Sequence, residues 1–293
     1  MENPSYAYLG PPGTFSELAI AKYSQQYGGE TIPCDSIREI VGAIMEERVD
    51  LGLLPLENSL EGSVNLSLDL LFQEEELQLY RELVLPIEHF LLAPDRIELE
   101  SIEEIYSHPQ AIAQSGDYLN KYLPRARIVY TESTAAAAGK IKDQKNKVVI
   151  GSSRLAEIYN LEILDQNLEG ELPNSTRFVL AGRRGLNMLE DINHSLPQTT
   201  EFYRTSIICT PRVNQPGVLH KILGEFARRE IDLTRIESRP TRKRLGEYIF
   251  YIDLKGHREQ SQLQQALTGV KEKSGYYRWL GSYPRIQLRE RSR

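Results

Sequence analysis

Hydrophobic and polar positions change period repeatedly over the first 184 residues, which predicts alternating strands and helices. The run Tyr6-Ala7-Tyr8-Leu9 is typical of a short strand, and Gly10-Pro11-Pro12-Gly13 follows it as a turn. Thr14 and Glu17 match a capping box, so a helix should begin there and extend toward Gly28. The chain therefore opens with a strand, a polar loop and a helix.

The same succession of strand, loop and helix recurs along the chain. Ser36 and Glu39 form a second capping box, and the apolar residues around it have helical spacing: Ile37, Ile40, Val41 and Ile44. Short apolar runs predict further strands that begin at Leu51, Ile105, Arg127 and Val148. Alternating strands and helices favour parallel sheets, whose ligand sites lie outside the carboxyl ends of the strands.

Two segments are suited to connect two lobes. The apolar run at 83–93 is interrupted only by Glu88 and His89, and residues 176–181 provide a return crossing. Two crossings predict a two-lobed α/β domain over residues 1–184, similar in architecture to type II periplasmic binding proteins, with a cleft between its lobes.

The chain after residue 184 predicts a linker and a second domain. Residues 185–204 have weak periodicity and many Asn, Pro, Thr and Gln residues, as linkers do. Residues 205–293 then predict strands at 206–210, 233–238, 248–254 and 277–283, and helices at 218–229 and 260–273. This βαββαβ order is that of an α+β, ferredoxin-like domain.

Composition and charge support two domains and exclude several protein classes. The 293 residues are 40% hydrophobic and 26% charged, and no apolar run approaches the roughly 18 residues that cross a membrane. The first residues do not resemble a secretory signal, so we expect a cytoplasmic protein. Residues 200–293 carry a net charge of +9 and the rest −15, but the basic charges are scattered and no nucleic-acid motif accompanies them.

Small hydroxyl and amide side chains are concentrated in the loops after the predicted strands. They are Thr14, Asn58, Ser59, Gln110, Ser133 and Thr134. Each alone is also an ordinary helix cap or turn residue. Thr176 and Arg177 place a hydroxyl beside a permanent cation, although this stretch also resembles a simple turn. Together, these residues suit a small molecule that carries carboxylates.

Other chemistries find little support in the sequence. It contains no G-x-G-x-x-G, no phosphate-binding G-x-x-x-x-G-K-[ST], no H-E-x-x-H and no G-x-S-x-G motif. The five histidines are dispersed, and Cys34 and Cys209 lie far apart. We therefore expect neither a metal site nor a cofactor.

Five motifs resemble those of the prephenate dehydratase family, in the order of that family. They are YLGPPGTFS at 8–16, PLENS at 55–59, SHPQ at 107–110, ESTA at 132–135 and NSTRF at 174–178. The C-terminal part is similar to the family's ACT regulatory domain, through PGVL at 216–219 and ESRP at 237–240. The resemblance covers residues 6–285, and no chorismate mutase segment precedes it, so a monofunctional form is expected.

The resemblance implies the decarboxylating dehydration of prephenate to phenylpyruvate in L-phenylalanine biosynthesis, without a cofactor. By the family's pattern the catalytic residues are Thr176, Arg177 and Phe178, and the substrate-binding residues are Thr14, Asn58, Ser59, Gln110, Ser133 and Thr134. We expect Thr176 to donate a hydrogen bond to the departing hydroxyl. Arg177 should anchor the side-chain carboxylate or shape the site, since pairing with the carboxylate that leaves would stabilise the ground state.

The ACT resemblance implies feedback regulation by L-phenylalanine, bound across the interface of a homodimer or homotetramer. The residues implied are Asn214, Gly217, Val218, Leu219, Glu237, Ser238 and Arg239. Gly217 can also simply begin a helix. Arogenate dehydratase shares the same motifs and is an open alternative, whereas a non-catalytic amino-acid sensor is disfavoured by the intact Thr176-Arg177-Phe178.

Overall fold

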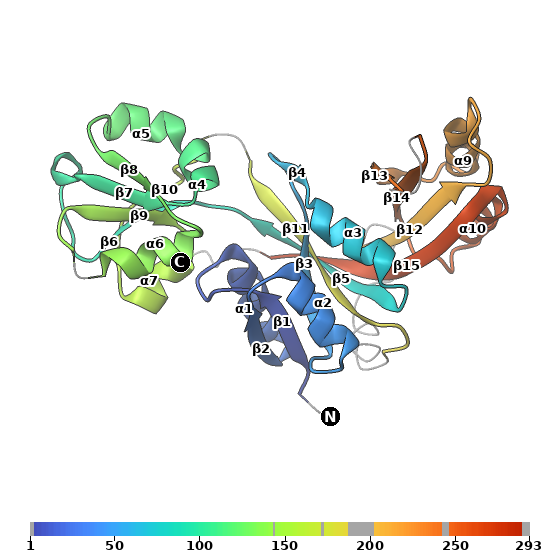
Figure 1. Cartoon of the computed structure of the whole chain (residues 1–293), viewed down its shortest axis with the longest axis horizontal. Coiled ribbons are helices and arrows are strands. Elements are labelled where there is room, and N and C mark those ends of the chain that lie inside the picture. The colour runs from blue at the N-terminus through green and yellow to red at the C-terminus, as the bar shows by residue number, and fades with distance from the viewer. Residues whose placement is uncertain (1–2, 143, 171–172, 187–201, 242–245, 289–293) are drawn as a thin grey trace. The chain divides into compact units, whose positions relative to one another are not determined.

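The computed structural model describes residues 3–142, 144–170, 173–186, 202–241 and 246–288. The chain divides into two compact units (Figure 1). Unit 1 comprises Met1–Leu70, Val84–Phe178 and Gln287–Arg293, and unit 2 comprises Leu71–Leu83 and Val179–Ile286. The strands β5 (Leu77–Pro86) and β11 (Ser175–Arg183) contribute residues to both units.

The first sheet region of unit 1 is built on parallel strands. β1 (Ser5–Leu9) pairs in parallel with β2 (Glu30–Cys34) and β3 (Leu51–Asn58), and β4 (Gly62–Ser63) pairs antiparallel with β3. The helices here are α1 (Phe15–Tyr27), α2 (Ile37–Met45) and α3 (Asn65–Gln73). α1 and α2 contact these strands and begin at the predicted caps, where Thr14 accepts from Glu17 N and Ser36 from Glu39 N.

The second sheet of unit 1 has the strand order β10-β6-β9-β7-β8. Its strands are β6 (Phe90–Ala93), β7 (Glu104–Ser107), β8 (Arg127–Tyr130), β9 (Lys147–Gly151) and β10 (Glu162–Gln166). Its helices are α4 (Pro109–Gln114), α5 (Gly116–Tyr122), α6 (Thr134–Ile141) and α7 (Ser153–Tyr159), besides a 3-10 turn at Leu99–Ser101. β7 is parallel to β8 and β9, and β6 is antiparallel to β9 and β10.

The second sheet is covered on both faces, which explains its continuous apolar strands. Val148 and Ile150 of β9 join the core that contains Ile112 and Leu119, whereas Val149 between them joins the core of the Ala-rich α6. Alternate residues of one strand thus enter different cores. The predicted α/β arrangement is confirmed for both sheet regions, with antiparallel pairing at β4, β6 and β10.

The connections between the two sheets differ in part from the prediction. The chain leaves β5 and enters β6 through residues 87–89, inside the predicted crossing at 83–93. On the return, β10 ends at Gln166 and β11 begins at Ser175, so the predicted crossing at 176–181 lies within β11. Asn167 and Gly170 have φ of 58° and 75°, a backbone conformation that ends β10 before the sheet is left.

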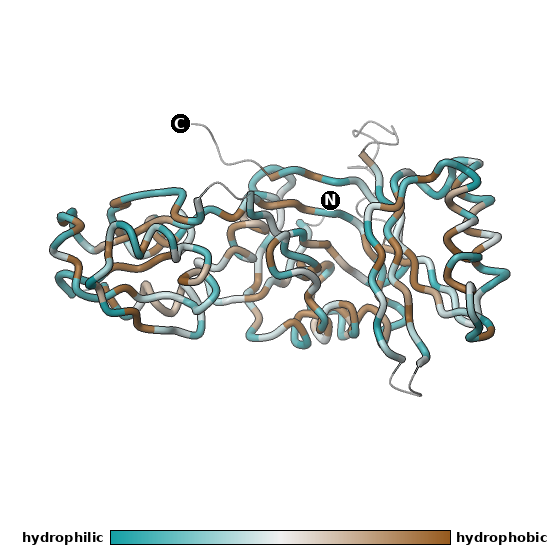
Figure 2. The backbone as a smooth tube through the Cα atoms, turned by 90° about the horizontal axis from the view of Figure 1, so that it is seen from above, coloured by the Kyte–Doolittle hydropathy of each residue, from teal (hydrophilic) through white to brown (hydrophobic). Residues whose placement is uncertain are grey.

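Unit 2 contains the predicted βαββαβ order. Its elements are β12 (Tyr203–Pro211), α9 (Val218–Ala227), β13 (Leu233–Pro240), β14 (Tyr248–Lys255), α10 (Ser261–Lys273) and β15 (Ser274–Gln287). The strand order is β13-β14-β12-β15-β5-β11, and both helices share one core with the strands. Figure 2 shows apolar positions recurring along the strands and helices. Segment 71–83 joins this unit, which extends it beyond the predicted domain at 205–293, and most of the predicted linker lies outside the described residues.

Both cysteines are buried and free in this fold. Burial raises the pKa of the Cys209 thiol to about 12, so this side chain behaves as an apolar core residue. Among the described helices, none combines the length and the apolar character that a membrane span requires.

Candidate active site

Asn58, the last residue of β3, is the centre of a hydrogen-bond network. Its Oδ1 accepts the backbone N–H groups of Leu60 (2.9 Å) and Glu61 (3.1 Å). Its Nδ2 donates to Asn174 Oδ1 (2.9 Å) and to Thr176 Oγ1 (3.0 Å). These four bonds use the full donor and acceptor capacity of an amide, so the orientation of Asn58 is fixed.

Asn174 continues this network toward the second sheet of unit 1. Its Nδ2 donates to Oε1 of Gln114, the last residue of α4 (3.0 Å), and its carbonyl accepts from Ile87 N (2.9 Å). Gln114 Oε1 also lies 2.8 Å from Nε2 of His89. Asn174 is 5% exposed and His89 2% exposed, so the network is screened from bulk water.

The hydroxyl of Thr176 is prepared to donate a hydrogen bond. Its oxygen accepts from Asn58 Nδ2, which polarises it and leaves its own O–H available. Within the described part of the chain, Thr176 Oγ1 makes no second hydrogen bond. Ser59 N donates to Ser175 O (2.9 Å) and Ser175 N donates to Ser59 Oγ (3.0 Å), which ties the loop after β3 to the start of β11 beside Thr176.

Arg177 lies on the opposite face of β11 from Thr176, because successive side chains of a strand alternate. Its Nη1 is 3.6 Å from Glu57 Oε2, and the Arg177 side chain is 8% exposed against 38% for Glu57. Phe178 returns to the face of Thr176 and is buried. This contact joins Arg177 of β11 to Glu57 near the end of β3.

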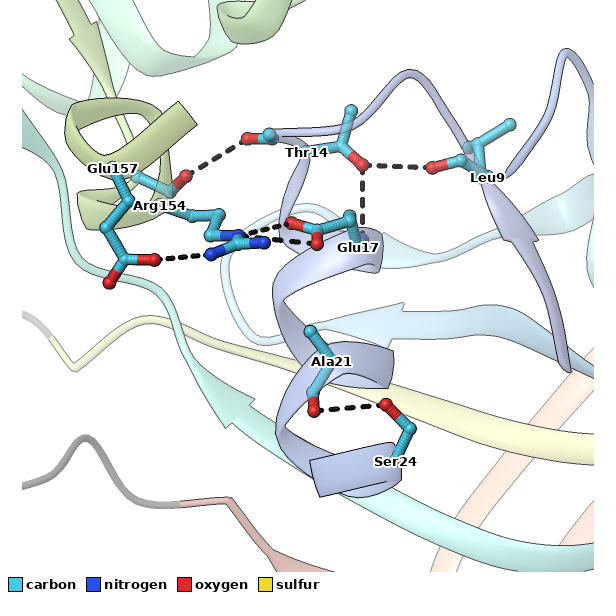
Figure 3. A network of polar contacts seen from close by, with 9 residues as sticks. Leu9, Thr14, Glu17, Ala21, Ser24, Arg154 and Glu157 are labelled. Carbon is cyan, nitrogen blue, oxygen red and sulfur yellow. Dashed lines mark hydrogen bonds and ion pairs between the residues drawn. The ribbon is translucent and has the colours of Figure 1, made fainter. Parts of the chain in front are cut away.

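A second polar cluster surrounds the start of α1. Thr14 Oγ1 donates to the last carbonyl of β1 (2.9 Å) and accepts from Glu17 N (3.2 Å), so its hydroxyl serves as the N-cap of α1. Glu17 Oε2 pairs with Arg154 Nε of α7 at 3.2 Å (Figure 3). This ion pair connects the two sheet regions of unit 1.

The remaining predicted substrate-binding residues lie at helix starts of the second sheet. Ser133 Oγ accepts from Ala136 N (3.0 Å) as the N-cap of α6, and Thr134 follows it, 8% exposed. Gln110 is half-buried in the first turn of α4. Within the described residues, none of these three is hydrogen-bonded to the network of Asn58.

His89, Gln114 and Asn174 were not predicted as site residues from the sequence. His89 stands beside the second polar cluster as well, since its ring is 5.5 Å from that of Phe15, the residue after Thr14, at 76°. Burial lowers the pKa of His89, opposed by the Gln114 hydrogen bond and by Glu169, so the ring is neutral near pH 7. A histidine within an apolar run was the available signal, because a buried polar side chain requires partners.

Two polar atoms of this network, and one of the residue after Gln114, stay unsatisfied. Among the described residues, His89 Nδ1, Gln114 Nε2 and Ser115 Oγ are buried without a hydrogen-bond partner. Leaving a buried polar atom unpaired generally costs about 1–3 kcal/mol, so each of these atoms calls for an explanation, of which a functional role is one. The described residues contain no group of three His, Cys, Asp or Glu side chains that could hold a metal ion.

Unit 2 contains a cavity of about 760 Å³ at the start of α9. Four of the predicted effector-site residues line it: Asn214, Gly217, Val218 and Leu219. Its aromatic lining comes from Phe72, Tyr248, Phe250 and Tyr276, and its carboxylates from Glu75 and Glu247. Gly217 has a φ of 79° before the first turn of α9, a left-handed conformation that favours glycine.

The other three predicted effector-site residues, Glu237, Ser238 and Arg239, lie on β13 at the end of the strand order and do not line this cavity. Glu237 Oε2 is 3.6 Å from Arg235 Nη2 on the same strand. The structure therefore brings one of the two predicted effector motifs to a cavity and places the other at a sheet edge.

Comparison with protein families covers both regions of the chain. The model described as prephenate dehydratase matches residues 6–185, and the model of the ACT domain matches residues 212–272. The chain is 39% identical to a prephenate dehydratase of Methanocaldococcus jannaschii, over 96% of this chain and 98% of that protein. It is 36% identical to the chloroplastic arogenate dehydratase 5 of Arabidopsis thaliana, over 96% of this chain and 67% of that protein.

A solved structure shares the whole fold. The prephenate dehydratase of Arthrobacter aurescens, in complex with L-Phe, has a TM-score of 0.83 and 34% identity, over 96% of this chain and 90% of that one.

Proposed function

The chain belongs to the prephenate dehydratase family, and on this premise we propose that the hydroxyl of Thr176 assists the departure of the ring hydroxyl of prephenate. The enzyme converts prephenate to phenylpyruvate in L-phenylalanine biosynthesis. The observation that supports the role of Thr176 is the bond that its oxygen accepts from Asn58, which leaves the O–H to donate.

The reaction needs a donor at the departing oxygen more than it needs a strong acid. As the carboxylate leaves as CO2 and the ring becomes aromatic, negative charge develops on the departing hydroxyl. An aliphatic O–H transfers its proton poorly, but a preorganised donor that meets this charge lowers the barrier by about 2.7–4 kcal/mol. The final proton then comes from water beside the hydroxyl.

We assign Arg177 the shaping role rather than the anchoring one. The face of β11 that carries Arg177 and the pairing of Arg177 with Glu57 of β3 favour a brace for the end of β3, which carries Asn58. Thr14, Gln110, Ser133 and Thr134 complete the substrate site from α1, α4 and α6. Their small polar groups at helix starts suit the two carboxylates of prephenate.

L-Phenylalanine regulates the enzyme through the cavity at the start of α9. The cavity offers aromatic side chains to the phenyl ring of the effector, Glu247 or Glu75 to its ammonium group, and backbone N–H groups of the turn at Gly217 to its carboxylate. Glu237, Ser238 and Arg239 would contribute from a second subunit of a homodimer or homotetramer. We place the enzyme in the cytoplasm.

One assay tests this function. The purified protein is mixed with prephenate or with arogenate, and the formation of phenylpyruvate or phenylalanine is followed with and without L-phenylalanine. We expect phenylpyruvate from prephenate and a lower rate when L-phenylalanine is present. A preference for arogenate would identify the alternative activity, and no product from either substrate would contradict the assignment.

A further inference from the structure

We propose that His89 is a positioning residue for this reaction, which acts through Gln114, Asn174 and Asn58 to keep Thr176 in its donating orientation. The inference rests on the proposed role of Thr176 and assigns a function to a histidine that lies outside the five sequence motifs. Its basis is the direction of each hydrogen bond between the backbone N–H groups that Asn58 accepts, at one end of the network, and His89 at the other.

The direction of the network is set by the backbone at one end. Asn58 Oδ1 accepts two backbone N–H groups, which can only donate, so the group that faces Asn174 and Thr176 is the Asn58 NH2. Asn174 must then present Oδ1 to Asn58 and Nδ2 to Gln114. None of the side-chain amides in this hydrogen-bond network can turn over without placing two donors or two acceptors opposite each other.

The same logic determines the proton position on His89. Gln114 receives the Asn174 donor on Oε1, and this oxygen also faces His89 Nε2 at 2.8 Å. Nε2 must therefore carry the hydrogen, and Nδ1 the lone pair. If the hydrogen were on Nδ1, the lone pair of His89 Nε2 would face the lone pairs of Gln114 Oε1. Turning the Gln114 amide over would instead place its NH2 group against the NH2 group of Asn174.

The surroundings of His89 fix its ring for this purpose. The Phe15 ring meets it edge to face, and its backbone N–H donates to Glu169 Oε2 at 2.9 Å. The side chain is 2% exposed, so water does not replace the Nε2 donor when it is lost. Without it, Gln114 keeps only the bond from Asn174 Nδ2, so its side chain becomes mobile and Asn174 holds the Asn58 amide less firmly, although the backbone still sets the direction of that amide.

Two substitutions at His89 separate donation from packing. His89→Leu replaces the imidazole with an apolar side chain of similar size and so removes the donor. We expect it to lower kcat by about tenfold to about a hundredfold, with KM changed by less than about twofold. His89→Gln can place its amide N–H near the position of Nε2, and should retain kcat within about threefold of the wild type.

A second comparison asks whether His89 acts through Thr176. In a Thr176→Val background, His89→Leu should lower kcat by less than about twofold, because the hydroxyl that it orients is gone. A full additional loss in this background, or a kcat of His89→Gln as low as that of His89→Leu, would overturn the proposal.

The protonated nitrogen can be observed without any assay of activity. Long-range ¹H–¹⁵N correlation on wild-type protein with labelled histidine reports which ring nitrogen carries hydrogen, and the signal missing from His89→Gln identifies His89. We expect the neutral form with hydrogen on Nε2 near pH 7. Hydrogen on Nδ1 would overturn the inference even if the enzyme is fully active, whereas an inactive wild type would instead remove the proposed function.

Discussion

Asn58→Asp removes both hydrogen bonds that the Asn58 amide donates and keeps the two that it accepts. The carboxylate keeps an oxygen for the backbone N–H groups of Leu60 and Glu61, as Asn58 Oδ1 does. It replaces the NH2 that donates to Asn174 Oδ1 and Thr176 Oγ1. Thr176 then donates its hydrogen to residue 58 instead of to the departing oxygen of the substrate.

The expected loss follows from removing one preorganised donor. We expect kcat to fall by about a hundredfold to about a thousandfold, equivalent to about 2.7–4 kcal/mol of transition-state stabilisation. Initial rates of phenylpyruvate formation give kcat and KM, and thermal unfolding shows whether the variant is folded. Asn160→Asp is the matched control, since it adds the same charge at the exposed end of α7. A folded Asn58→Asp variant with kcat within about threefold of the wild type would refute the reasoning.

Three further predictions concern other parts of the chain. Arg177→Lys keeps the charge but loses the planar donor group, so it should lower the unfolding temperature and leave KM within about twofold of the wild-type value. An increase in KM at an unchanged unfolding temperature would show instead that Arg177 anchors the substrate. Val218→Trp should fill the cavity of unit 2. The L-phenylalanine concentration for half-inhibition should then rise by at least about tenfold, while kcat without the effector stays unchanged. Inhibition at the wild-type concentration would exclude this cavity as the effector site. Hydrogen bonds from Arg127, Tyr106 and Lys147 lower the pKa of Glu104 to about 2, so its stabilisation is present above pH 4.5 and is lost as the pH falls toward 2. Glu104→Gln should therefore reduce the free energy of unfolding at pH 7 more than at pH 3, and equal losses at both pH values would contradict this.

The periodicity of the chain was sufficient to predict most of the architecture. The capping residues Thr14 and Ser36 begin helices as expected, and the βαββαβ order after residue 203 follows the predicted ranges. The strand β10 was not predicted, because Glu162–Gln166 pairs with only one neighbour at a sheet edge and has no continuous apolar run. The predicted return crossing at 176–181 lies within β11, after the end of β10.

The candidate site was predictable only in part. Asn58, Ser59 and Thr176 are close in space because β3 ends where β11 begins, whereas the rule for strand ends places ligand sites only at carboxyl ends. Thr14 and Ser133 are N-caps, the ordinary alternative, and their role toward substrate stays a prediction. Gln114 and His89 lie 25 residues apart in sequence and meet through a contact of their side chains, which periodicity does not encode.

The most direct measurement is the turnover of prephenate by Thr176→Val and Thr176→Ser. Valine has the shape of threonine without the hydroxyl, and serine keeps the hydroxyl that Asn58 orients. We predict that Thr176→Val lowers kcat by at least about a hundredfold and that Thr176→Ser stays within about tenfold of the wild type. A folded Thr176→Val enzyme that turns over prephenate at the wild-type rate would contradict the central role given to this hydroxyl.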